Sequence, residues 1–147
     1  MKLAAFICLA AFLIAAGFYI FRYQFTMRNT LPPSYEIHRW EVDAILRNSA
    51  NVALVLGTGS MAPAIRAGRP DEVVALVSYA PRDFSLLGAG DLVLFDHAQA
   101  GLIVHQLAQL DGAGWISTGS ANSRYDSGRI TRKNLRGVVT AIYNIKP

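Results

Sequence analysis

Short apolar runs separated by glycine-containing turns are the feature that most constrains how this chain can fold. The runs are rich in Val, Ile and Leu, and they have the length and β-branched content of buried strands. Gly, Asn, Asp and Pro, which favour turns, lie between them. The runs occupy residues 52–56, 73–77, 92–95, 101–107, 115–119 and 135–143. The sequence therefore predicts that residues 51–147 form a mainly β domain.

The first two dozen residues have a different character. Residues 3–21 carry no charge, and as a helix rising about 1.5 Å per residue they would reach about 29 Å. That length matches the ~30 Å hydrocarbon core of a bilayer, and a helix satisfies its own backbone hydrogen bonds in lipid. We therefore expect a transmembrane anchor at residues 1–21. A cleavable signal peptide is the alternative, because Lys2 supplies a basic start and residues 15–17 are small.

Residues 22–50 are expected to connect this anchor to the β domain. A polar stretch ends in two consecutive prolines, which is typical of a short, stiff linker. Residues 34–48 then place Ile37, Trp40 and Ile45 at helical spacing. This pattern predicts an amphipathic helix in which Trp40 packs against the domain.

Charge and cysteine content narrow the range of partners. The chain carries 14 Lys and Arg against 10 Asp and Glu, a net charge of +4, and the basic residues are scattered. Scattered charge does not favour nucleic-acid binding, which needs a basic patch. The single cysteine, Cys8, predicts neither an intrachain disulfide nor a zinc site. We expect no metal and no organic cofactor, and we expect the basic stretch at residues 129–136 to be a solvated face.

One serine lies where a strand is expected to stop sharply. Ser60 follows the run at residues 52–56 and lies within Gly-Thr-Gly-Ser-Met-Ala-Pro, residues 57–63. Glycine permits tight backbone, and proline prevents the strand from continuing. The hydroxyl is therefore expected at an exposed edge, where a serine with a base beside it is a candidate nucleophile. An ordinary glycine-rich turn is the alternative interpretation.

Two further residues could serve such a serine. His105 lies inside the apolar run at residues 101–107, where a buried imidazole needs a hydrogen-bond partner. Asp126 lies in the polar loop at residues 120–128. Each also has a plain structural interpretation, as a satisfied core histidine and as an ordinary turn carboxylate.

Taken together, these pieces resemble the signal peptidase I family. The family pattern is a membrane anchor, Ser-Met-x-Pro, Gly-Asp-hydrophobic-Val, a strand that bears the base, a Gly-Asp-x-Asn loop with a later aspartate, and a Gly-x-Val strand. The matching residues are Ser60-Met61-Ala62-Pro63, Gly90-Asp91-Leu92-Val93, His105, Gly119-Ser120-Ala121-Asn122 with Asp126, and Gly137-Val138-Val139. The resemblance covers the anchor and residues 52–143. It implies an antiparallel β catalytic domain of signal-peptidase type.

The resemblance also implies roles for individual residues. The family uses a lysine base or, in the endoplasmic-reticulum and archaeal type, a histidine. This chain has His105 at that position, and Lys133 lies in a polar stretch that lacks the desolvation a neutral lysine needs. We therefore expect Ser60 as the nucleophile, His105 as the general base and Asp126 as the residue that orients it. The backbone N–H of Ser60 and the hydroxyl of Thr58 would form the oxyanion hole.

The implied activity is that of a membrane-anchored serine endopeptidase with its catalytic domain on the extracytoplasmic side of the membrane. It would cleave signal or leader peptides from preproteins that carry small residues before the cleavage site. Three positions depart from the family pattern, since Thr118 replaces a lysine, Ser120 replaces an aspartate and Gln106 replaces an arginine. A specialised processing peptidase of the pilin or conjugal-transfer type is one alternative. A catalytically inactive, membrane-tethered module that binds peptides along a strand edge is another.

Overall fold

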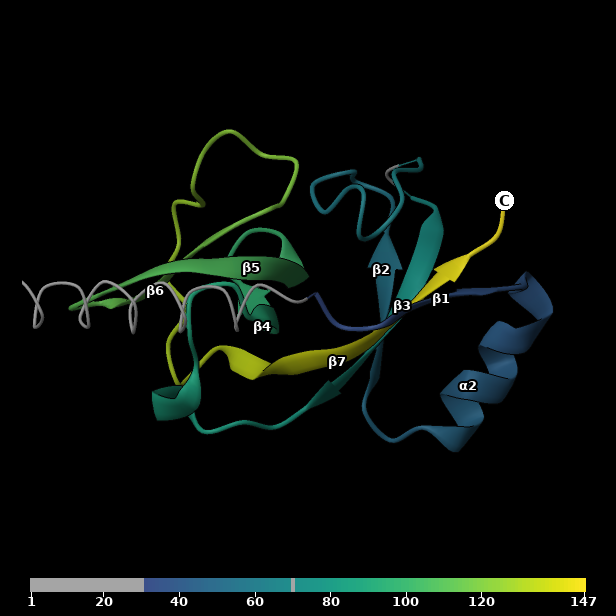
Figure 1. The fold of residues 1–147 in the computed structure, drawn as a ribbon, viewed down its shortest axis with the longest axis horizontal. Helices are drawn as coiled ribbons and strands as arrows, with labels where there is room; N and C mark the ends of the chain where they lie inside the picture. The colour runs from purple at the N-terminus through teal and green to yellow at the C-terminus, as the bar shows by residue number, and fades with distance from the viewer. Residues whose placement is uncertain (1–30, 70) are drawn as a thin grey trace, which may run out of the picture. The chain divides into compact units, whose positions relative to one another are not determined.

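The computed structural model describes residues 31–69 and 71–147 (Figure 1). In these residues the chain forms a seven-stranded sheet, one short α-helix and two 3-10 turns. The helical segments are η1 (Arg39–Glu41), α2 (Val42–Asn48) and η2 (Phe84–Leu86). The strands are β1 (Ser34–Ile37), β2 (Val52–Leu56), β3 (Val73–Ala80), β4 (Leu92–His97), β5 (Gly101–Asp111), β6 (Gly114–Thr118) and β7 (Leu135–Ile145). The predicted mainly β fold is confirmed.

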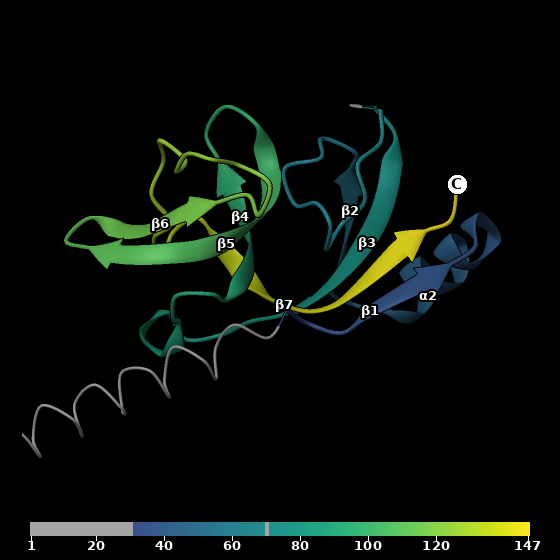
Figure 2. The same cartoon turned by 45° about the horizontal axis from the view of Figure 1, so that its top comes forward.

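The sheet is organised around β7, an eleven-residue strand. The strand order is β2-β3-β7-β4-β5-β6, and β1 pairs with the end of β7 in parallel. All other strand pairs are antiparallel. β7 pairs with β3 along most of its length and with β4 only near its start. It therefore joins a β2–β3 half of the sheet to a β4–β5–β6 half, and both halves are visible in Figure 2.

Buried apolar side chains form three clusters on this sheet. One draws on β2, β3, β4, β5 and β7 and includes Met61 and Ile65 from the loop after β2. A second lies on the β4–β5–β6 half and contains Trp115. Burial of a side chain such as Met61 or Ile65 is worth roughly 1.5–3 kcal/mol. The loop that carries Ser60 is therefore fixed to the core rather than free in solvent.

The predicted helix at residues 34–48 is wrong in its first part. Residues 34–37 form β1, and only Val42–Asn48 form an α-helix. The end of β7 offers a strand edge, on which Tyr35 lies opposite Tyr143, with the two rings stacked 5.5 Å apart. The expected packing role of Trp40 is also wrong, because its side chain is 76% exposed. Tertiary pairing overrode the helical spacing of the apolar residues.

The predicted anchor at residues 1–21 lies outside the described residues. Across residues 31–69 and 71–147, the one α-helix is too short to cross a bilayer, and no other helix there is long and apolar enough to do so.

Candidate active site

The loop after β2 that carries Ser60 is closed at its base by backbone hydrogen bonds. The Gly57 N–H donates to the carbonyl of Glu72 at 2.9 Å, and the Gly68 N–H donates to the carbonyl of Gly57 at 3.1 Å. A Cβ atom at Gly57 would lie 2.6 Å from the Cα of Gly68, so only glycine allows this close approach. The two ends of the loop, at Gly57 and Gly68, are therefore held in direct backbone contact.

An ion pair also holds this loop. The guanidinium of Arg66 donates to Oε1 of Glu72 at 2.6 Å and to the carbonyl of Ile145, at the end of β7, at 2.9 Å. The hydrogen bond from Arg66, together with the backbone N–H of Arg69, holds the pKa of Glu72 below its ordinary value of 4.5. Arg66 therefore links the serine loop to β7.

A second loop, between β6 and β7, lies directly against Ser60. The Ala121 N–H donates to the carbonyl of Ser60 at 2.9 Å. A Cβ atom at Gly119 would lie 2.4 Å from that same carbonyl oxygen. The glycine at position 119 thus lets the two loops meet, and the loop after β6 is the one that contains Asp126.

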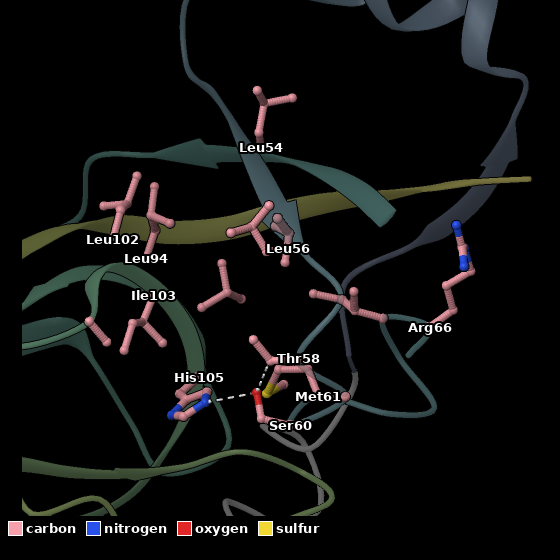
Figure 3. Close-up of a pocket in the computed structure, with 15 residues that line it drawn as sticks. Leu54, Leu56, Thr58, Ser60, Met61, Arg66, Leu94, Leu102, Ile103 and His105 are labelled. Carbon is pink, nitrogen blue, oxygen red and sulfur yellow. Dashed lines mark hydrogen bonds between the residues drawn. The ribbon is translucent and has the colours of Figure 1, made fainter. Parts of the chain in front are cut away.

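His105 reaches Ser60 from the other half of the sheet. It lies within β5, opposite Val93 of β4, and only 7% of it is exposed. Its Nε2 atom lies 3.2 Å from the Oγ of Ser60 (Figure 3). Asp126 lies on the opposite side of the ring, with its Oδ2 2.6 Å from Nδ1 of His105. The three residues proposed from sequence therefore meet in one hydrogen-bonded line.

The chemistry of this line follows from which group can donate. An ionised carboxylate can only accept hydrogen bonds. Nδ1 of His105 therefore carries the ring proton and donates the hydrogen bond to Asp126. Nε2 of the neutral ring is then an acceptor, and the Ser60 hydroxyl donates to it. This is the arrangement in which an imidazole can remove a proton from a serine that attacks a carbonyl.

Thr58 lies beside the candidate nucleophile. Its Oγ1 is 3.2 Å from the Oγ of Ser60. The side chain is exposed, so the hydroxyl can rotate toward a ligand. A hydroxyl at this distance can donate to an oxygen that develops negative charge next to Ser60.

Sequence reasoning did not single out Ser117, although its hydroxyl touches the candidate acid. Ser117 is on β6 and is only 1% exposed, and its Oγ donates to Oδ2 of Asp126 at 2.6 Å. The one sequence signal is alternation, because Ser117 shares a strand face with Trp115 and that face is buried. A serine on a buried strand face needs a polar partner.

A groove of about 490 Å³ opens beside Ser60 and His105. Its flanks come from β2 and β5, and Figure 3 places Leu54, Leu56 and Leu102 around it. Each of these three leucines is about half exposed. In the described part of the chain, β2 is the edge strand at one end of the sheet. β6 pairs with β5 only from Gln106 onward, so the first part of β5 has no strand partner on that side among the described residues. Both flanks therefore present strand edges that can pair with an extended peptide.

Gln106 and Ser120, two of the positions that depart from the family pattern, both have local partners. Gln106 donates from Nε2 to the carbonyl of Gly90 at 3.0 Å, which ties β5 to the turn before β4. Ser120 approaches the sulfur of Met61 at 3.9 Å. Neither contact reaches the carboxylate of Asp126.

The arginines of the basic stretch at residues 129–136 are at least partly exposed, as expected, and each also forms an ion pair. Each of the three arginines contacts an aspartate from another part of the chain, namely the end of β5, the residue before η2 or strand β4. The pairs are Arg129 with Asp111 at 2.9 Å, Arg132 with Asp83 at 3.6 Å and Arg136 with Asp96 at 2.6 Å. Lys133, the alternative base, is exposed in the turn before β7.

Comparison of the chain with protein-family models, with curated proteins and with solved structures finds no match. Within the residues described, no group of three or more His, Cys, Asp and Glu side chains is placed to hold a metal ion.

Proposed function

We propose that this protein is a membrane-anchored serine endopeptidase that removes signal or leader peptides from exported proteins. The observation that carries the proposal is the line from Ser60 Oγ through His105 to Asp126, with hydrogen bonds of 3.2 and 2.6 Å. A core histidine needs only one partner to be satisfied. This imidazole has a partner on each nitrogen, and one of them is a hydroxyl at the edge of an open groove.

In the proposed reaction, the Ser60 oxygen attacks the scissile carbonyl while Nε2 of His105 takes the hydroxyl proton. His105 then returns this proton to the leaving amine, and water hydrolyses the acyl-enzyme by the reverse sequence of proton transfers. Asp126 keeps the ring in the correct tautomer and stabilises the imidazolium. The Ser60 N–H and the Thr58 hydroxyl would stabilise the oxyanion.

The groove supports a substrate that binds in extended form. A peptide pairing with the edge of β2 would run past Leu54 and Leu56 toward Ser60. A preference for small side chains before the cleavage site is carried over from the family resemblance alone. The uncharged residues 3–21 would anchor the protein as a single-pass membrane protein. The catalytic domain would then lie on the extracytoplasmic side and act next to the bilayer.

Cleavage of a preprotein by the purified full chain in detergent tests this proposal. Parent protein should release the mature product, and Ser60→Ala should not. Ser123→Ala, which alters an exposed serine in the neighbouring loop, is the matched control and should cleave like the parent. Undiminished cleavage by the Ser60→Ala protein would show that the assignment of Ser60 as the nucleophile is wrong. Peptide binding without turnover by the parent would favour the inactive peptide-binding module instead.

A further inference from the structure

A buried hydroxyl lies behind the candidate acid. Ser117 and His105 are the two polar residues that are buried in the described part of the chain. The Oγ of Ser117 donates to Oδ2 of Asp126 at 2.6 Å, and its carbonyl accepts from the Asp126 N–H at 2.8 Å. Residue 126 is therefore joined to β6 through both its backbone and its side chain.

One carboxylate oxygen receives two donors. Oδ2 of Asp126 accepts from the Ser117 hydroxyl and from Nδ1 of His105, each at 2.6 Å. β6 pairs with β5 so that Ser117 lies opposite Leu107, two residues from His105. Alternate residues point to the same face of a strand, so Ser117 and His105 reach Asp126 from one face of the sheet.

The Ser117 hydroxyl uses its one proton in the hydrogen bond to Asp126. A serine has one proton to donate, and among the described residues Asp126 is the acceptor it meets. Asp126 belongs to a loop with little regular structure, so its carboxylate could otherwise occupy several rotamers. A carboxylate oxygen fixed at this position would favour a proton on Nδ1 of His105 and leave Nε2 facing Ser60.

We propose that Ser117 is a positioning residue, which holds the carboxylate of Asp126 so that His105 is oriented toward Ser60. Its effect on turnover rests on the proposed peptidase function. Its effect on the position and tautomer of His105 does not, so the two can be tested separately.

The kinetic test uses the full chain in detergent with a preprotein or signal-peptide substrate. Ser117→Ala should lower kcat roughly 10- to 100-fold, the range for a lost hydrogen bond to a charged group, with little change in KM. Ser117→Thr keeps the hydroxyl and should recover most of the loss. Thr118→Val is the matched control, because its hydroxyl donates to the carbonyls of Gly119 and Arg124 in the same loop. It should keep kcat near that of the parent.

A double-mutant cycle separates positioning from a general loosening of the loop. If Ser117 acts only through the carboxylate, adding Ser117→Ala to an Asp126→Asn protein should cause little further loss of kcat. An equal loss in both backgrounds would overturn the proposal, because it would mean that Ser117 acts independently of Asp126.

The second readout needs no turnover. The proton on Nδ1 of His105, held in a short hydrogen bond to a carboxylate, should give a downfield ¹H NMR signal in the parent and in Thr118→Val. Ser117→Ala should shift or broaden this signal. An unchanged signal in Ser117→Ala would overturn the positioning role. A signal that responds as expected in a protein that hydrolyses no peptide would support the positioning role while refuting the proposed function.

Discussion

Nε2 of His105 lies 3.2 Å from the Oγ of Ser60, although the two residues are 45 positions apart in the chain. Ser60 follows β2, whereas His105 lies within β5, so the contact bridges the two halves of the sheet. These halves are joined by β7, which pairs with β3 on one side and with β4 near its start. The register of β7 therefore controls whether the Ser60 hydroxyl and the His105 ring can meet.

Removal of the imidazole should be nearly as severe as removal of the nucleophile. His105→Ala should lower kcat by at least about 10³-fold, because the serine then has no base to accept its proton. The measurement is the rate of preprotein cleavage by the full chain in detergent. His38→Ala, at an exposed histidine between β1 and η1, is the control and should keep the parent rate. Activity retained in His105→Ala but lost in Lys133→Ala would instead assign the base to the lysine.

Loss of the hydroxyl beside Ser60 should slow the chemical step. Thr58→Val should lower kcat about 100-fold, equivalent to about 3 kcal/mol of transition-state stabilisation, if the hydroxyl donates to the oxyanion. Thr58→Ser keeps the donor and should retain most of the activity. Steady-state kinetics on a peptide substrate measure both variants. Equal kcat values for Thr58→Val and Thr58→Ser would contradict the proposed role of the Thr58 hydroxyl in the oxyanion hole.

The ion pair at the base of the serine loop should make stability depend on pH. The hydrogen bond from Arg66 to Glu72 lowers the pKa of the carboxyl in the folded protein below the ordinary value of 4.5, which applies when the chain is unfolded. The folded state therefore binds this proton less readily, and the stabilisation is present above about pH 4.5. It is lost as the pH falls through the lowered pKa of the folded state.

Urea unfolding of the full chain in detergent, followed between about pH 3 and pH 7, measures this effect. The difference in midpoint between the parent and Glu72→Gln should be largest near neutral pH and should narrow below about pH 4.5. Asp83 and Asp111, whose pKa values are also lowered, are present in both proteins and so cancel in the comparison. Arg66→Met removes the partner of Glu72, so the difference in midpoint between the parent and this variant should show the same pH dependence as for Glu72→Gln. A midpoint difference that is constant across this range would contradict the assignment.

Much of the architecture could be predicted from local sequence pattern. The apolar runs that predicted strands correspond to β2 through β7, because buried strands need apolar side chains at close spacing. A turn separates β4 from the chain before it, where Asp91 accepts from the Gly88 N–H at 2.8 Å. Glycines at 57 and 119 lie where two backbones approach closely, which is a position that only a residue without a side chain can occupy.

Predictions that depended on distant partners were less successful. Residues 34–37 have a helical pattern but form a strand, because the end of β7 provides an edge for pairing. The arginines of residues 129–136 were expected to form a solvated basic face; they stay at least partly exposed, but each is paired with an aspartate from another part of the chain. In both cases, the deciding partner lies outside any local window of sequence.

The sequence by itself determined the types of residue available to the site and the strands and turns that carry them. A serine in a glycine-rich turn, a histidine in an apolar strand and an aspartate in a polar loop are all local facts of the chain. Only the tertiary structure decided that Asp126 and the Ser60 hydroxyl face opposite nitrogens of His105, and that Ser117 lies behind the carboxylate. The reason is physical: strand register sets the face on which each side chain lies, and long-range pairing through β7 sets that register.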